Sequence, residues 1–266
     1  MGKINLLSSA VFNRIAAGEV IERPFSVVKE LVENSIDAGA NKITVSVTDG
    51  GLSNITVTDN GDGIFKDDLK NALLPHATSK IADVEDLDDI KTLGFRGEAL
   101  ASIASVSKIT IESQKNEDEL GGKIYCEGGK IGEISDVSSV KGTEISVSNL
   151  FFNAPVRAKF LKSARAEESE ITSTVARFIF GNPEISFTLL LNGKKQLQSF
   201  GDGISSAFLA VYGLSVMNNC FFVDTEKHGI KVKGYIGKHY YTKPNRTYQT
   251  VFLNKRYIVN NTVSSA

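Results

Sequence analysis

The stretch VKELVENSIDAGA, from Val28 to Ala40, predicts a short helix with one polar face. Three carboxylates and one amide follow the i, i+3, i+4 and i+7 spacing of helix neighbours: Glu30, Glu33, Asn34 and Asp37. The opposite face is apolar and carries Val28, Leu31, Val32 and Ile36. Like charges at this spacing destabilise a helix. The polar face is therefore either solvated or part of a site, and by itself the stretch leaves both interpretations open.

The residues around this stretch predict an α+β fold. Pro24 suits a first helical turn and Gly39 a helix exit, which predicts a helix over 24–38. Alternating apolar residues predict a hairpin of strands 43–47 and 55–59, and Asn192-Gly193 predicts another between 185–191 and 194–200. Further strands are expected over 108–113, 122–129, 130–137, 143–150, 220–224, 230–237 and 247–259, and helices over 66–74, 97–106, 167–180 and 205–213.

The order of these elements favours an antiparallel or mixed sheet with helices on one face, since regular strand–helix alternation is missing. A change of character after Gly203 predicts two lobes, 1–203 and 204–266, of which the second is incomplete. No apolar run approaches the roughly 18 residues of a membrane span, and the N-terminus does not fit a signal peptide. Cys126 and Cys220 match no metal or redox spacing, so two free thiols in a reducing compartment are expected.

Charge is divided unevenly along the chain. The formal net charge is −1. Residues 1–150 hold 15 Lys and Arg against 24 Asp and Glu, whereas residues 151–266 hold 15 against 7. Eight basic residues and no acidic residue follow from Lys227 to the end. This asymmetry predicts that the two halves face different partners.

Several familiar sites are absent from the sequence. It has no GxxxxGK[ST] phosphate loop, no GxGxxG after a strand, no GxSxG elbow and no zinc-spaced histidines. DNGDG, from Asp59 to Gly63, begins like a calcium loop, but Gly61 stands at its third position and Lys70 at its twelfth. A nucleotide would therefore have to bind by another route.

Two stretches can supply that route directly. On the helix, Asn34 offers an oxygen of the kind that Mg²⁺ takes alongside phosphate oxygens, and Glu30 can orient or deprotonate a water. After a strand, ionised Asp59 only accepts hydrogen bonds, which suits the exocyclic amine of adenine, while Gly61 and Gly63 permit close approach. Each stretch alone also fits a solvated helix face or a plain turn.

Two more stretches carry groups suited to anions. HATSK, from His76 to Lys80, gathers hydroxyls and a cation. LGFRGEALASI, from Leu93 to Ile103, has glycines on both sides of Arg96 and then enters a helix. Loop amides and a helix N-terminus together can bind phosphate. A glycine-rich loop alone is weak support.

The combination in this order resembles the GHKL ATPases, which include DNA gyrase, heat-shock chaperone ATPases, histidine kinases and MutL proteins. Longer matches resemble the N-terminal ATPase region of the MutL DNA mismatch-repair family over essentially the whole chain. They are IAAGEVIERP, VKELVENSIDAGA, HATSKI, GFRGEALASI and LFFNAPVRAKFL. The resemblance implies a Bergerat-type sandwich followed by a partial S5-like lobe.

The resemblance also implies roles for individual residues. Glu30 corresponds to the general base, Asn34 to the Mg²⁺ ligand, and Asp59, helped by Thr143, to the adenine contact. The resemblance makes the loop LGFRGEAL, from Leu93 to Leu100, a lid over the phosphates. The remaining nucleotide contacts correspond to positions in the TSK stretch, the glycine turn and this lid: Gly61, Gly63, Thr78, Ser79, Lys80, Gly94, Arg96, Gly97, Glu98, Ala99 and Leu100. Glu33 and Asp37 receive only support or solvation roles. The family's His-Pro-x-Lys motif does not occur in these 266 residues, so slow hydrolysis is expected.

The basic C-terminal part suggests sequence-independent DNA contact. Lysines and arginines interleave with tyrosines there, and Arg256 corresponds to a family position that contacts DNA. The candidate DNA residues are Lys238, Lys243, Lys255 and Arg256. A solvated sheet face is the alternative.

Together these inferences predict an ATP-driven switch of mismatch repair with ATP and Mg²⁺ as cofactors. ATP would close the lid, order residues 1–20, pair two copies into a homodimer that clamps DNA, and recruit a mismatch-recognition protein and downstream enzymes. The compartment would be cytoplasmic, or nuclear in a eukaryote. Two alternatives remain: another GHKL ATPase of topoisomerase or chaperone type, and a nucleotide-independent DNA scaffold.

Overall fold

The structure, a computed structural model, describes residues 20–80, 93–94, 97–115, 120–138, 141–245 and 248–262. These residues divide into two compact units. The first takes the described residues up to Thr174 together with Thr188–Gln196, and the second takes Val175–Phe187 and the described residues from Leu197 onward. The second unit thus also includes residues before 204, and the expected boundary after Gly203 stays a prediction.

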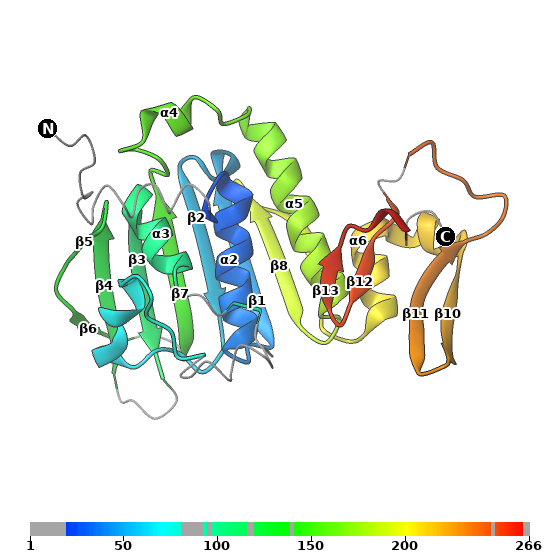
Figure 1. Cartoon of the computed structure of the whole chain (residues 1–266), viewed down its shortest axis with the longest axis horizontal. Helices are drawn as coiled ribbons and strands as arrows, with labels where there is room; N and C mark the ends of the chain where they lie inside the picture. The colour runs from blue at the N-terminus through cyan, green and yellow to red at the C-terminus, as the bar shows by residue number, and fades with distance from the viewer. Residues whose placement is uncertain are drawn as a thin grey trace, which may run out of the picture. The chain divides into compact units, whose positions relative to one another are not determined.

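The chain forms helices and strands in a mixed order (Figure 1). The first part holds α2 (Pro24–Asp37), β1 (Lys42–Thr48), η1 (Asp49–Gly51), β2 (Asn54–Asp59), η2 (Lys66–Asp68), η3 (Asn71–Leu73), α3 (Ala99–Val106), β3 (Lys108–Gln114), β4 (Gly121–Glu127), β5 (Lys130–Ile131), β6 (Ser135–Val137), β7 (Gly142–Ser148) and α4 (Pro155–Ala158). After α4 the chain forms α5 (Ala164–Gly181), β8 (Ser186–Leu191), β9 (Lys194–Gln198), α6 (Ile204–Asn218), β10 (Cys220–Lys227), β11 (Ile230–Gly237), β12 (Val251–Leu253) and β13 (Arg256–Ile258).

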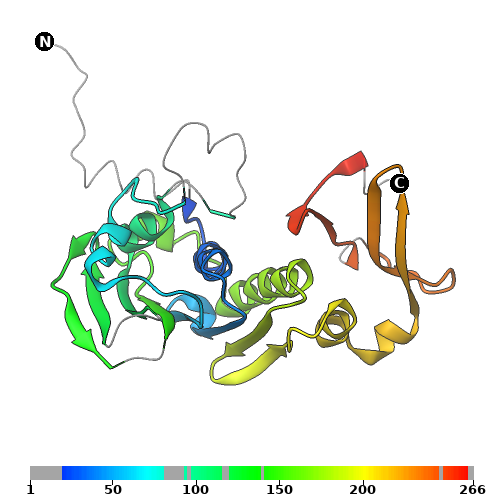
Figure 2. The same ribbon diagram turned by 90° about the horizontal axis from the view of Figure 1, so that it is seen from below.

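Nine strands form one sheet in the order β5-β4-β3-β7-β2-β1-β8-β9, with β6 added on β4. The central pairs β3–β7, β7–β2 and β2–β1 are antiparallel. Helices α2 and α3 cover one face of this sheet (Figures 1 and 2). The expected α+β sandwich of antiparallel or mixed sheet with helices on one face is confirmed.

The core lies between α2 and the sheet, as the apolar periodicity predicts. Ile43, Val45 and Val47 alternate with exposed or half-buried neighbours along β1 and are at most 1 % exposed. On α2 the buried residues are Pro24, Ser26, Val27, Val28, Leu31, Val32 and Ser35. Ile36, expected on the apolar face, is only half-buried, and Ser35 turns inward in its place.

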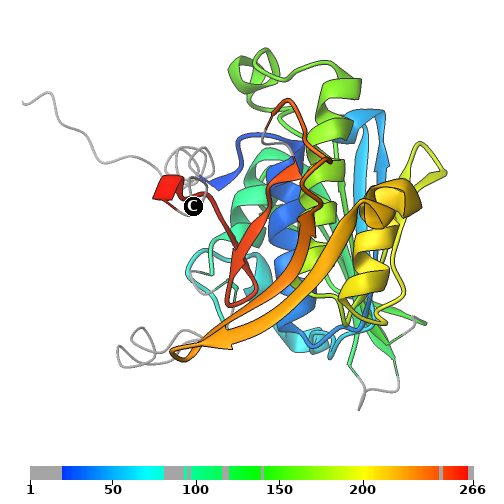
Figure 3. The same ribbon diagram turned by 90° about the vertical axis from the view of Figure 1, so that its right-hand side faces the viewer.

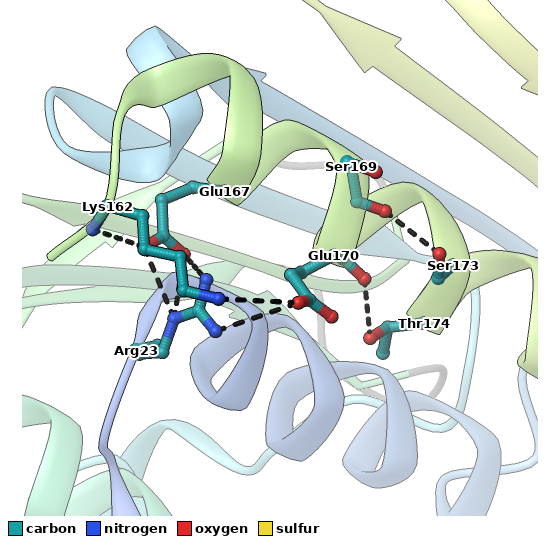
Figure 4. A network of polar contacts seen from close by, with 7 residues as sticks. All are labelled: Arg23, Lys162, Glu167, Ser169, Glu170, Ser173 and Thr174. Atoms are coloured by element: carbon teal, nitrogen blue, oxygen red, sulfur yellow. Dashed lines mark hydrogen bonds and ion pairs between the residues drawn. The ribbon is translucent and has the colours of Figure 1, made fainter.

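An ion pair ties the start of α2 to the start of α5 (Figure 4). The guanidinium of Arg23 donates to Glu167 Oε1 at 3.2 Å and to Oε2 at 3.0 Å, and the Glu167 side chain is fully buried. The backbone N–H of Lys162 donates to Glu167 Oε1 at 2.9 Å, and Glu170 lies 3.7 Å from Arg23. A buried carboxylate needs such partners. This network holds the loop before α5 on α2.

Four expected elements differ in detail. Residues 66–74 form two 3₁₀ turns, η2 and η3, rather than one helix, and 130–137 is split into β5 and β6. The helix expected over 205–213 extends to Asn218 through Gly213, whose φ of 76° is not helical. The single strand expected over 247–259 is a hairpin, β12–β13, because Asn254 and Lys255 both adopt the positive φ of a two-residue turn.

In the second unit, β10 and β11 pair as a long antiparallel ribbon (Figure 3). The ring of Phe208 on α6 stacks on that of Tyr235 on β11, with ring centroids 4.2 Å apart. Within the ribbon, the Tyr235 ring also contacts the Phe222 ring of β10, with centroids 5.3 Å apart. Among the described residues, no helix has the length and apolarity that a membrane crossing requires.

Candidate functional site

Asp59 and Thr143 lie side by side at one end of the sheet. Asp59 ends β2 and is the register partner of Thr143 on β7, which in turn is paired with Ser113 on β3. The Ser113 and Thr143 hydroxyls are 2.9 Å apart, and the Ile64 N–H donates to Ser113 Oγ at 2.8 Å. Three adjacent strands therefore bring one carboxylate and two hydroxyls into a row.

The Asp59 carboxylate is held by two donors. Ser35 Oγ on α2 donates to Oδ2 at 2.7 Å, and the Gly61 N–H donates to Oδ1 at 2.9 Å. The Asp59 side chain remains half-buried rather than sealed, and each oxygen keeps a lone pair for another donor. A fixed acceptor of this kind suits an amine of a planar ligand.

Gly61 and Gly63 let the turn after Asp59 pack against neighbouring backbone. A Cβ on Gly61 would lie 2.6 Å from the Ala38 carbonyl at the end of α2. Gly63 has a φ of 75°, and a Cβ there would lie 2.4 Å from the Gln114 carbonyl on β3. The glycines thus serve a close backbone approach that fixes Asp59 between α2 and β3.

Glu30 and Glu33 share one cation on the polar face of α2. Lys29 Nζ donates to Glu30 at 2.8 Å and to Glu33 at 3.1 Å. Burial alone would lower the pKa of Lys29, but its hydrogen bonds and the charges of both glutamates outweigh this and raise it. Burial, the largest cause, raises the pKa of Glu33, with Lys29 opposing and the charges of Glu30 and Asp37 adding. Glu30 stays about one-fifth exposed, so a water can reach its carboxylate.

Asp37 joins α2 to two loops. It accepts from Lys80 Nζ at 2.6 Å and from the backbone N–H groups of Leu93 at 2.9 Å and Gly94 at 3.0 Å. The same Lys80 Nζ donates to Asn34 Oδ1 at 3.0 Å. The HATSK and lid stretches therefore meet on the polar face of α2, as an anion site built from these stretches requires.

The rest of the lid packs on the HATSK stretch. Gly97 has a φ of 63°, and a Cβ there would lie 2.6 Å from the Ala77 carbonyl. Glu98 lies 3.4 Å from His76 Nδ1, and the Thr78 hydroxyl accepts from the Lys80 N–H at 3.2 Å. Ala99 and Leu100 begin α3, and Ser79 stands between the two bonded residues. Arg96 lies outside the described residues.

The residues fit a Mg²⁺ ion that is bound mainly through a nucleotide. No cluster of three or more His, Cys, Asp or Glu suited to a metal occurs among the described residues. Mg²⁺ often takes one or two protein oxygens and fills its sphere with phosphate and water. Asn34 Oδ1 accepts from the Lys80 ammonium, so this oxygen already faces a cation, and a metal ion there would have to replace that hydrogen bond.

The candidate DNA residues all belong to the second unit, and its three lysines have partners there. Lys238 Nζ donates to the Asn218 carbonyl at 2.7 Å, Lys243 lies over the rings of Tyr241 and Tyr248, and Lys255 is paired with Glu184. Arg256 begins β13. Contact with DNA would have to break or share these interactions.

Two residues of the site were not predicted from the sequence, and a third was predicted without a specific role. Ser35 and Ser113 were not singled out, although both hold the predicted adenine end. Inward Ser35 on an otherwise apolar face was the available signal. Asp37 received no specific role, because its partners come from 43 to 57 residues further along the chain.

Comparison with known proteins identifies the relatives of both parts. Residues 21–140 match the family described as histidine kinase-, DNA gyrase B- and HSP90-like ATPase. Residues 208–266 match the DNA mismatch repair protein, C-terminal domain. The DNA mismatch repair protein MutL of Clostridium botulinum (strain Kyoto / Type A2) is 51% identical over the whole chain, and that of Clostridium tetani is 47% identical. The chain spans 40% and 43% of their lengths.

Solved structures agree with this grouping. The Aquifex aeolicus MutL ATPase domain complexed with ADP is 32% identical with a TM-score of 0.72, over 92% of this chain and 87% of that one. The N-terminal domain of a DNA repair protein is 29% identical with a TM-score of 0.78, over 95% and 79%. The predicted resemblance is confirmed. On the strength of the GHKL ATPase match, the mismatch-repair domain match and these relatives, the chain belongs to the MutL family of DNA mismatch-repair proteins.

Proposed function

We propose that this chain binds ATP with Mg²⁺ and hydrolyses it as the nucleotide-driven switch of a mismatch-repair protein. The observation that carries the proposal is the fixed acceptor at Asp59, which Ser35 and Gly61 hold beside Thr143. It provides an adenine end, while Glu30, Asn34 and Lys80 gather at a phosphate end on α2. A MutL relative whose structure was solved with ADP supports the binding of a nucleotide.

The residues divide the chemistry between binding and proton transfer. Asp59 accepts from the adenine amine, and Thr143 adds a hydroxyl beside it. The lid holds the phosphates, and Asn34 would hold Mg²⁺, which when bound neutralises phosphate charge. Glu30 takes a proton from water as the water oxygen bonds to the γ-phosphorus, and the bond from that phosphorus to the ADP oxygen breaks. ADP and phosphate are the products.

Calorimetry with ADP and a non-hydrolysable ATP analogue tests the adenine end. Asp59→Asn presents a donor to the adenine amine, so binding should weaken by at least about tenfold, the effect of one lost charged hydrogen bond. Asp49→Asn is the matched control, because Asp49 follows β1 at the end away from Asp59. Unchanged binding by Asp59→Asn would favour the nucleotide-independent scaffold.

Single-turnover hydrolysis tests the phosphate end. Glu30→Gln should keep nucleotide affinity but lower the rate by about 10²–10⁴, the usual contribution of a general base. A variant that loses binding and rate together would remove Glu30 from the proton-transfer role. The rate of the 266 residues themselves is expected to be low, which a parallel measurement on a full-length MutL relative checks.

We also propose sequence-independent DNA contact by the second unit. Its basic excess carries this proposal, together with the position of Arg256 on β13. In a filter-binding salt titration, Lys255→Gln with Arg256→Gln should reduce the slope of log K against log salt by about 1.8, since each phosphate contact contributes about 0.9. Lys194→Gln in the first unit is the control. A wild-type chain without a salt slope would contradict DNA contact.

ATP-dependent pairing of two copies follows from the family resemblance alone. Most of the arm that would order on pairing, residues 1–20, lies outside the described residues. Size-exclusion chromatography with and without the non-hydrolysable analogue should show a shift from monomer to dimer. Identical elution would contradict the pairing, and with it the DNA clamp and the recruitment of a mismatch-recognition protein and downstream enzymes that depend on it.

A further inference from the structure

Both carboxylate oxygens of Asp37 accept hydrogen bonds from groups that lie far along the chain. Oδ1 accepts from the Leu93 N–H, and Oδ2 accepts from the Gly94 N–H and from Lys80 Nζ. Its side chain is only 5 % exposed. A carboxylate in this situation is stable only while these donors stay in place. Asp37 therefore constrains the lid backbone and Lys80 at the same time.

Lys80 in turn connects Asp37 to Asn34. Its ammonium lies 2.6 Å from Asp37 Oδ2 and 3.0 Å from Asn34 Oδ1. Asn34 and Asp37 are one helical turn apart on the same face of α2. The ammonium therefore stands beside the Asn34 oxygen that the resemblance assigns to the metal, and its place is set by Asp37.

We propose that Asp37 is a positioning residue of the nucleotide site. It holds the Lys80 ammonium and the Leu93–Gly94 backbone in a fixed relation to Asn34, so that phosphate meets a preformed arrangement of charge and amides. The proposal rests on the proposed ATP-binding function. The described hydrogen bonds of Asp37 go to Lys80, Leu93 and Gly94, so its proposed role is to place these groups.

The direction of the effect separates positioning from general electrostatics. Asp37→Asn removes a negative charge near a site for anions, so a purely electrostatic role predicts tighter nucleotide binding. A positioning role predicts weaker binding, because Lys80 and the lid amides lose their anchor. The structure favours the second outcome, as preorganised groups cost less to order on binding.

A double-mutant cycle on the 266-residue chain tests the link through Lys80, with ADP affinity as the readout. Asp37→Asn and Lys80→Met should each weaken binding by about tenfold, one charged hydrogen bond each. The double variant should match the single variants at about tenfold, because coupled residues are not additive. A loss near a hundredfold, or tighter binding by Asp37→Asn, would overturn the proposal.

Amide hydrogen exchange without nucleotide gives a second readout. Exchange at Leu93 and Gly94 should speed up by at least about tenfold in Asp37→Asn. It should stay unchanged in Asp49→Asn, the matched substitution at the other end of β1. Equal exchange in Asp37→Asn and wild type would overturn the anchoring role.

The two readouts also separate this inference from the proposed function. If the wild-type chain binds no nucleotide, the proposed function fails, and hydrogen exchange alone decides whether Asp37 anchors the lid. If Asp37→Asn does not fold, Asp37→Glu replaces it, since Glu keeps the charge but displaces the oxygens by one methylene. Wild-type affinity and exchange in Asp37→Glu would then overturn the inference.

Discussion

The two units of the chain are stabilised in different ways. In the first, central strands have a neighbour on each side and bury their apolar residues almost completely, as Ile43, Ile109 and Ile111 show with no exposure. In the second, Val175, Ile179 and Phe187 are at most 1 % exposed, but β10–β11 and β12–β13 are two-stranded sheets, and no described residue after Phe208 is buried. Two-stranded hairpins are marginal by themselves. The first unit therefore depends on burial, whereas the hairpins of the second unit depend on ring contacts and on cations over rings.

The largest expected effect is on the buried ion pair of the first unit. Arg23→Ala leaves the fully buried Glu167 without its guanidinium, which should cost about 3–5 kcal/mol of unfolding free energy. Lys162→Ala should change it by less than about 0.5 kcal/mol, because its ammonium is exposed and 4.0 Å from Glu170. Urea denaturation measures both. Equal effects would mean that the network does not hold α5 on α2.

A pair of isoleucines compares the two units directly. Ile111→Ala opens a cavity in the central sheet and should cost about 2–5 kcal/mol. Ile236→Ala, at a side chain that is 52 % exposed on β11, should cost less than about 0.5 kcal/mol. Denaturation curves of the two variants test the difference in burial. Similar losses would show that the β10–β11 ribbon is covered in solution.

The reactivity of the two cysteines measures the difference in burial between the two units in the unmutated chain. Cys126 is fully buried on β4, whereas Cys220 is half-buried at the start of β10. Burial raises the pKa of both thiols, so the reaction of each thiol with a labelling reagent should become faster as the pH rises. A thiol reagent should label Cys220 at least about a hundredfold faster, since Cys126 requires opening of the sheet. Labelling at equal rates would contradict this difference.

The smallest expected effect concerns Glu33. Burial, despite opposition from Lys29, raises the pKa of this carboxyl above 4.5 in the folded chain. Such a group favours folding only while protonated, so stability is lost as the pH rises through the unfolded and then the folded pKa. Glu33→Gln should therefore raise stability at neutral pH by up to about 0.5 kcal/mol and flatten its pH dependence above pH 4.5. Lower stability at neutral pH would mean that the bond from Lys29 outweighs burial.

Much of the fold could be predicted because local patterns carried it. The alternation of Ile43, Val45 and Val47 marked β1, and Pro24 and Gly39 bracketed α2 to within a residue. The β12–β13 hairpin was missed because Asn254 and Lys255 are not a strong turn pair. Their positive φ angles became visible only in the structure.

The site was only partly predictable for a different reason. Glu30, Asn34 and Asp59 stand in short motifs whose chemistry can be inferred from residue type and spacing. Ser113 depends on the strand order β3-β7-β2, which no local pattern encodes.

By itself, the sequence determined a helix with a polar face, a hairpin that ends in Asp59 and a basic C-terminal part. It also determined which side chains are able to accept, donate or carry charge. Only the tertiary structure decided that Ser35 locks Asp59 and that Asp37 joins Lys80 to the lid. Periodicity specifies which face of an element is buried, whereas the partner on the opposite side comes from residues far along the chain. Their meeting is set by the packing of the whole sheet and its helices.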